Sequence, residues 1–177
     1  MRDYETISLA LTAAETGHLV FATLHANTAA KTVDRIIDVF PTGDKEMVRA
    51  MLSNSLEGVI AQTLVQKAGG VGRVGAFEVL VGTNAVRNLI RENQVPQIYS
   101  MMQTGSRYGM ITMEESINNL LEEGVIGAAQ ARTVLMRAGD EGIGSEFQEE
   151  DRQKEETSKV AAASSAEGKQ DEEGYSF

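Results

Sequence analysis

The sequence predicts an α/β protein. Three observations predict this class: apolar residues at helical spacing before residue 17, a continuous apolar run at residues 18–25, and helical spacing again from residue 27. A strand between two helices is typical of folds built around a parallel sheet. Residues 140–177 differ from the rest, because they carry 12 acidic and 4 basic side chains, so most of the chain's net charge of −10 lies there.

The first helix is expected to begin at Asp3, a good N-cap, and to run to Thr16. Its apolar residues repeat at helical spacing: Ile7, Ala10, Leu11 and Ala14. Gly17 stands where a glycine commonly ends a helix. The segment 18-HLVFATLH-25 then changes period, and its run of Leu19, Val20 and Phe21 predicts a strand buried on both faces.

Two further helices and a hairpin are expected next. The segment 27-NTAAKTVDRIIDVF-40 predicts a helix capped by Asn27 or Thr28 and stopped by Pro41. A helix beginning near residues 42–44 should turn four apolar residues inward: Met47, Val48, Met51 and Leu52. Residues 61–67 and 73–81, joined by 69-GGVG-72, predict a β-hairpin, on which Arg73 and Glu78 are expected as a surface pair or at the hairpin ends.

Helical patterns fill the rest of the predicted fold. They cover residues 84–92, 95–103, 113–123 and 128–138, with Thr112 as a cap and Gly124 as a stop for the third. Residues 148–174 are charged and low in complexity, which is typical of a disordered tail. We therefore divide the chain into residues 1–83, a helical subdomain at 84–139, and an acidic tail at 140–177.

Composition excludes several function classes. An acidic chain lacks the clustered Lys and Arg that a nucleic-acid backbone needs, so no nucleic-acid partner is expected. There are no cysteines, and therefore neither disulfides nor a thiolate metal site. No apolar run approaches the ~20 residues that span a bilayer, and no signal peptide follows Met1. We expect a soluble cytoplasmic protein.

The only two histidines, His18 and His25, lie at the two ends of the predicted strand. Seven residues of strand separate them by roughly 23 Å, and the odd spacing turns them to opposite faces. A shared metal ion is therefore excluded, and no metal site is expected. His25 precedes a helix N-terminus, where an imidazole could orient a phosphate or simply satisfy backbone groups. For His18 a structural role is the simpler interpretation.

These residues resemble a known family. The segment 1-MRDYETISLALTAAETGHLVFATLHANTAAKTVDRIIDVFP-41 resembles the ATPase core of type IV pilus retraction (twitching motility) ATPases, within the type II/IV secretion superfamily. Within it, 12-TAAETGHLVFATLH-25 resembles the family's His box, and 1-MRD-3 the end of its Walker B segment. The resemblance extends to about Gly139 and implies the C-terminal part of a RecA-like P-loop ATPase core, followed by a helical subdomain.

The resemblance also implies roles for individual residues. His25 would lie near the γ-phosphate of ATP, His18 would be a further candidate catalytic residue or a contact between subunits or domains, and Arg2 and Asp3 would help to organise the nucleotide site. The intact family member would bind ATP and Mg²⁺ between the subunits of a homo-hexamer. It would retract pili at the pilus base, in the cytoplasm beneath the inner membrane, with a membrane platform protein as partner.

A second element, 85-AVRNLIRE-92, resembles the AIRNLIRE element of the same family. Its residues are Ala85, Val86, Arg87, Asn88, Leu89, Ile90, Arg91 and Glu92. Val86, Leu89 and Ile90 form an apolar stripe, and Arg87 and Arg91 share another face, where two like charges repel slightly. The arginines therefore predict an acidic partner or a neighbouring subunit. By resemblance the element couples hydrolysis to retraction.

One family motif does not occur in these residues. No G-x-x-x-x-G-K-[ST] sequence is present, since 69-GGVG-72 is followed by Arg73 and Val74. The chain by itself is therefore expected neither to hydrolyse ATP nor to bind it tightly. Two alternatives remain: a fragment of a pilus-assembly or type II secretion ATPase, which the absence of cysteines disfavours, and a non-catalytic modulator that docks into full-length rings.

Overall fold

The structure is a computed structural model that describes residues 3–138. The chain divides into two compact units, Met1–Arg132 and Thr133–Phe177, and the first unit holds nearly all the described elements. The predicted acidic tail lies outside the described residues. The predicted boundary between residues 83 and 84 stays a prediction.

The first predicted helix is confirmed. Helix α1 spans Tyr4–Glu15, and the Asp3 side chain caps it by accepting a hydrogen bond of 3.0 Å from the Thr6 amide. Thr16 is its C-cap, and Gly17 follows with a φ of 89°, a left-handed conformation in which glycine carries no Cβ penalty. Ile7 and Leu11 are buried, as their spacing predicts.

The predicted strand at residues 18–25 is wrong. This segment has no regular secondary structure. Leu19 and Phe21 of its apolar run are 79% and 89% exposed, while Leu24 is half-buried against the core. A strand needs a neighbouring strand to pair its backbone groups, and the sheet of the described residues consists of two strands, neither of which pairs with this segment. The argument that the histidines point to opposite faces of a strand therefore no longer applies.

The next two helices are confirmed with one change. Helix α2 spans Ala29–Asp38 with Thr28 as its N-cap, and helix α3 spans Lys45–Ser55. Val48 and Leu52 of α3 are buried, but Met47 is 58% exposed. Met47 lies one residue before the buried Val48, and a helix turns about 100° per residue, which carries Met47 out of the packed stripe.

The hairpin is confirmed and longer than predicted. Strand β1 spans Gly58–Gln66 and pairs antiparallel with β2, Arg73–Val81. This hairpin is the one sheet among residues 3–138, so the expected parallel sheet is not found there. One face of the hairpin is covered by protein, while the other exposes Ile60, Leu64 and Phe77.

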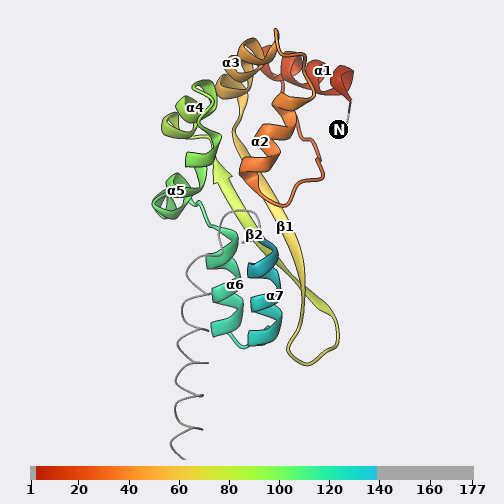
Figure 1. Cartoon of the computed structure of the whole chain (residues 1–177), viewed down its shortest axis with the longest axis vertical. Helices are drawn as coiled ribbons and strands as arrows, with labels where there is room; N and C mark the ends of the chain where they lie inside the picture. Colours follow the sequence, from red (N-terminus) through yellow and green to blue (C-terminus); the bar gives the residue numbers. More distant parts are fainter. Residues whose placement is uncertain (1–2, 139–177) are drawn as a thin grey trace, which may run out of the picture. The chain divides into compact units, whose positions relative to one another are not determined.

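The remaining elements are short helices, as predicted. They are α4 (Asn84–Arg91), η1 (Val95–Gln97), α5 (Ile98–Gln103), η2 (Ser106–Tyr108), α6 (Met113–Glu122) and α7 (Ala128–Ala138). Thr112 caps α6 through its hydroxyl oxygen, and Gly124 follows that helix with a φ of 70°. Figure 1 shows α4 beside α3 and α6 alongside β2, pairs that pack against each other.

A single cluster of buried side chains joins the elements from α1 to α5. It takes Ile7 and Leu11 from α1, Val33 and Ile37 from α2, and Leu80 from β2. Val86 and Ile90 of α4, and several residues after it, belong to the same cluster. The core therefore fixes α4 against the helices that follow residues 18–25, which we call the histidine segment. No helix within residues 3–138 is long and apolar enough to cross a bilayer.

Candidate functional site: the histidine segment and the arginine clamp

The turn after His25 is held from two sides. Arg35 of α2 donates a hydrogen bond from Nη1 to the His25 carbonyl oxygen. Thr28 accepts from the Lys31 amide at 3.2 Å, which satisfies one of the donors that every helix N-terminus leaves unpaired. The His25 side chain is exposed. Backbone contacts therefore fix the position from which this imidazole projects.

Glu78 of β2 holds the other side of this turn. Its Oε1 accepts a hydrogen bond of 2.6 Å from the Ala29 amide, the first amide of α2. The side chain is only 2% exposed, so the prediction of a surface residue is wrong. The alternation of side chains along a strand could have predicted this burial. Every second residue of β2 points inward, and the buried set is Ala76, Glu78 and Leu80. The anion at the α2 N-terminus is thus a carboxylate of the chain itself.

The Glu78 carboxyl has a raised pKa. Burial raises it, while the backbone amides of Ala29 and Met113 lower it and do not fully compensate. Its Oε2 is buried without a hydrogen-bond partner among the described residues. Because Met113 opens α6, this one side chain acts on the first amides of two helices.

Tyr99 extends this polar cluster to α5. Its hydroxyl donates a hydrogen bond of 3.0 Å to Glu114 Oε2 on α6. Burial, then the hydrogen bond and charge of Glu114, then the charge of Glu78 raise the pKa of Tyr99 to about 12, while Thr112 opposes the rise. The histidine turn and the later helices therefore meet around one buried carboxyl group.

His18 has a different environment. Its Nδ1 lies 3.0 Å from the Thr16 hydroxyl oxygen and 3.2 Å from the Ala13 carbonyl oxygen, at the C-terminal end of α1. Asp3 caps the opposite end of that 12-residue helix, roughly 18 Å away at 1.5 Å per residue. The structure therefore places two of the candidate residues at opposite ends of α1. Arg2 lies outside the described residues.

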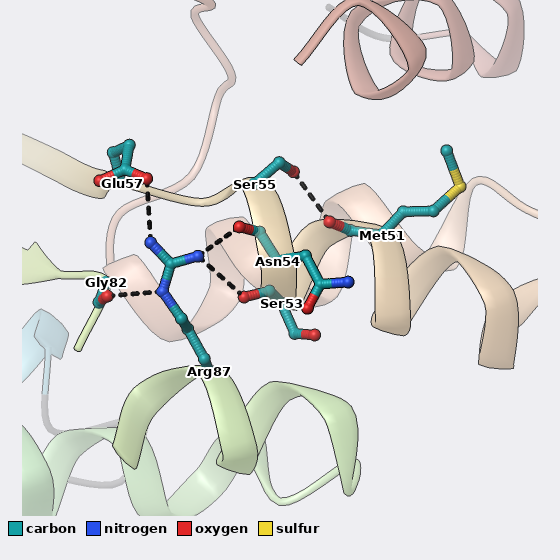
Figure 2. Close-up of polar contacts among 7 residues, drawn as sticks. All are labelled: Met51, Ser53, Asn54, Ser55, Glu57, Gly82 and Arg87. Atoms are coloured by element: carbon teal, nitrogen blue, oxygen red, sulfur yellow. Dashed lines mark hydrogen bonds and ion pairs between the residues drawn. The ribbon is translucent and has the colours of Figure 1, made fainter. Parts of the chain in front are cut away.

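Arg87 forms the centre of the second candidate region (Figure 2). Its Nε donates to the Gly82 carbonyl oxygen at 2.8 Å, and its Nη1 donates to the carbonyl oxygens of Ser53, at 3.2 Å, and Asn54. Its Nη2 donates to Glu57 Oε1 at 2.9 Å. The side chain thus binds the last carbonyls of α3, the negative end of that helix dipole.

Arg91 binds the same end of α3. Its Nη2 donates to Asn54 Oδ1 at 3.0 Å and its Nη1 to Asn88 Oδ1 at 3.3 Å. We call Arg87 and Arg91 together the arginine clamp. The predicted acidic partner is confirmed for Arg87, where it is Glu57 of this chain; contact with a neighbouring subunit stays a prediction. Val86 and Ile90 are fully buried, as their spacing predicts, and Leu89 is half-buried.

Comparison with known proteins finds relatives of this chain among the secretion and pilus ATPases. The profile described as "Type II/IV secretion system protein" matches residues 1–70, which include both histidines. Over 132 residues, 75% of this chain, the sequence is 59% identical to the type IV pilus retraction ATPase PilT of Pseudomonas aeruginosa. It is 61% identical over 132 residues to the twitching motility protein of Neisseria gonorrhoeae.

The chain is homologous to the pilus retraction ATPases. A crystal structure of the pilus retraction motor PilT with bound ADP matches 74% of this chain with a TM-score of 0.66 and 50% identity. The predicted resemblance and the α/β fold class are therefore confirmed. This chain spans 38% of the Pseudomonas relative, 35% of the Neisseria relative and 36% of the crystallised chain.

The described residues fit only part of the nucleotide site expected of a retraction ATPase. They contain no cluster of three or more His, Asp or Glu side chains placed to hold a metal ion. Two amides of the first turn of α2 are already bonded, to Glu78 and Thr28, which leaves little of that helix N-terminus for a phosphate. Beside this helix N-terminus, His25 is exposed on a turn that Arg35 and Glu78 hold.

Proposed function

We propose that this chain provides the histidine-bearing part of the nucleotide site, and the coupling element, of an ATP-driven motor that retracts type IV pili. The sequence identity of about 60% over 132 residues to two retraction proteins supports this proposal. The family profile supports it further, because it matches residues 1–70, which carry both histidines. In the intact motor, six subunits form a ring that binds ATP and Mg²⁺ between neighbours.

In this proposal His25 contacts the γ-phosphate and reports its presence to α2. Arg35 and Glu78 fix the turn that carries His25, so a displacement of the imidazole moves the start of α2. The core then transmits that movement, because α2 and α4 share one buried cluster. Arg2 and Asp3 contribute to the same site from the start of α1, and His18 contributes at a contact between subunits or domains.

In this proposal the arginine clamp transmits the movement of α4 to α3. It joins α4 to the end of α3 by three hydrogen bonds, two from Arg87 and one from Arg91. Residues 85–92 can therefore move only together with α3, which suits an element that converts rotation of a domain into work. We place the motor in the cytoplasm at the pilus base, against a platform protein of the inner membrane, with no nucleic acid as partner.

A chimera tests the proposal. The 132 matched residues of this chain replace their counterpart in the Pseudomonas aeruginosa retraction ATPase, and twitching is measured in a strain that lacks its own copy. We expect twitching to be restored. A chimera that assembles into rings and hydrolyses ATP but retracts no pili would contradict the retraction role and favour an assembly or secretion ATPase.

A second function is supported by the exposed apolar side chains. Leu19 and Phe21 of the histidine segment, and Ile60, Leu64 and Phe77 of the hairpin, form surfaces that polypeptide commonly covers. A chain that docks by these surfaces into rings of full-length ATPase would modulate them without catalysis. Adding the purified chain to such an ATPase should then change its rate of ATP hydrolysis; an unchanged rate and no co-purification would exclude this role.

A further inference from the structure

A cavity of about 940 Å³ lies beside the arginine clamp. The first turn of α4 forms one part of its wall, and residues from α5 to η2 form another. Three arginines line it, Arg87, Arg91 and Arg107, and no aspartate or glutamate within residues 3–138 does. The charge of this wall is opposite in sign to the net charge of the chain, which is −10.

Two of these arginines are not neutralised. Arg87 is paired with Glu57, but Arg91 bonds only to neutral side-chain amides among the described residues. Arg107 donates to the Tyr108 hydroxyl at 2.8 Å and lies 4.6 Å from the centre of that ring, and it forms no ion pair with any other described residue. The cavity therefore has two positive charges in excess.

Both guanidinium groups are held in place before any ligand arrives. Asn54 and Asn88 fix Arg91, and Tyr108 fixes Arg107. Each guanidinium has five N–H donors, so several remain after these bonds. A fixed planar fork loses little further entropy when it binds an oxyanion, and it suits a carboxylate in particular.

We propose that this cavity binds an acidic peptide segment of a partner protein, with carboxylate side chains on Arg91 and Arg107. The rest of the wall suits a peptide, because Met101 and Met110 can adapt to apolar side chains while Asn84 can pair with a peptide backbone. Its volume is at the upper end of small-molecule sites and accommodates several peptide residues. The cavity shares Arg87 and Arg91 with the arginine clamp, but peptide binding is measured without nucleotide or pilus retraction, so the site and the proposed motor function can fail separately.

A binding measurement with two peptides tests this site. A fluorescein-labelled peptide of alternating Glu and Leu is titrated with the full chain, and fluorescence anisotropy reports binding. The same peptide with Gln in place of Glu should bind about tenfold more weakly or worse, because hydrogen bonds to charged groups are each worth roughly 1.5–3 kcal/mol. For the same reason R91Q/R107Q should weaken binding of the acidic peptide by about 100-fold.

Arg73→Gln is the matched control, because it removes one positive charge from an exposed hairpin position outside the cavity. It should leave binding unchanged. Circular dichroism shows whether R91Q/R107Q is folded. If it is not, Arg107→Gln alone decides, since among residues 3–138 the Arg107 side chain hydrogen-bonds only Tyr108. Equal binding of the Gln peptide, or an equal loss in R73Q, would overturn the proposal. So would pyrophosphate that displaces the peptide and binds more tightly than it, which would mark a phosphate site instead.

Discussion

The histidine segment and the arginine clamp differ in how well their side chains are buried and paired within the described residues. The first is apolar, yet Leu19 and Phe21 are exposed and the segment has no strand partner among the described residues. The second is rich in charge, yet Val86 and Ile90 are fully buried and both arginines are bonded within the chain. Whether a region is packed here depends more on finding packing and hydrogen-bond partners among the 136 described residues than on how hydrophobic its sequence is.

The largest effect should come from the core beneath the clamp. Ile90→Ala removes a fully buried side chain and should lower the free energy of unfolding by about 2–5 kcal/mol, measured by urea denaturation. Phe21→Ala removes a larger side chain that is 89% exposed and should change it by less than about 0.5 kcal/mol. Comparable losses in the two variants would show that the histidine segment is packed after all.

Substitution of the two histidines should have different effects on the rate of ATP hydrolysis. In the chimera with the Pseudomonas ATPase, His25→Ala should lower the rate of ATP hydrolysis by about 100-fold, the usual effect of removing a group that binds transition-state charge. His18→Ala, at the end of α1, should have a much smaller effect. Equal rates in the two variants would remove the distinction between a phosphate contact and a helix-end contact.

The stability that Arg87 contributes should depend on the planar geometry of its guanidinium group as well as on its charge. Arg87→Ala leaves the last carbonyls of α3 without their donor and should cost roughly 1.5–3 kcal/mol of unfolding free energy. Arg87→Lys keeps the charge but loses the planar fork, so it should recover only part of this loss. Arg73→Ala, at an exposed position, is the control, and a loss there as large as in R87A would contradict the clamp.

The smallest effect is a pH dependence from Glu78, the carboxyl that joins the two regions. Its folded-state pKa is raised above the unfolded value, so the folded chain binds this proton more tightly. Glu78 therefore contributes most to stability below its unfolded pKa, and this contribution falls as the pH rises through the raised pKa. Glu78→Gln cannot titrate, so its unfolding free energy should rise relative to the unchanged chain across that range. A constant difference between the two would show that the pKa is not raised.

Sequence patterns predicted those elements whose determinants are local. Asp3, Thr28 and Thr112 all cap the helices expected of them, and the hairpin forms around its glycine-rich loop. The strand at residues 18–25 could not be judged from its own residues, because strand formation depends on a neighbour elsewhere.

The candidate site was only partly predictable for a related reason. Arg87 and Glu57 lie 30 residues apart in sequence, and Glu78 and Ala29 lie 49 apart. Spacing on one helix or one strand can show that a charge is unpaired locally, as it did for the two arginines of α4. It cannot show which distant group pairs with it. The inward position of Glu78 was readable from the alternation along β2, but its partner was not.

Hydrogen exchange of the purified chain is the sharpest test of the contrast between the two regions. Backbone amides of α4 are bonded within the helix over a fully buried stripe, so those of residues 87–91 should be strongly protected. Amides of residues 19–22, in an exposed segment without regular structure, should exchange close to the rate of an unfolded peptide. In the chimera with the Pseudomonas ATPase, the same amides of residues 19–22 should become protected. Protection of residues 19–22 in the chain alone, equal to that of α4, would contradict this contrast.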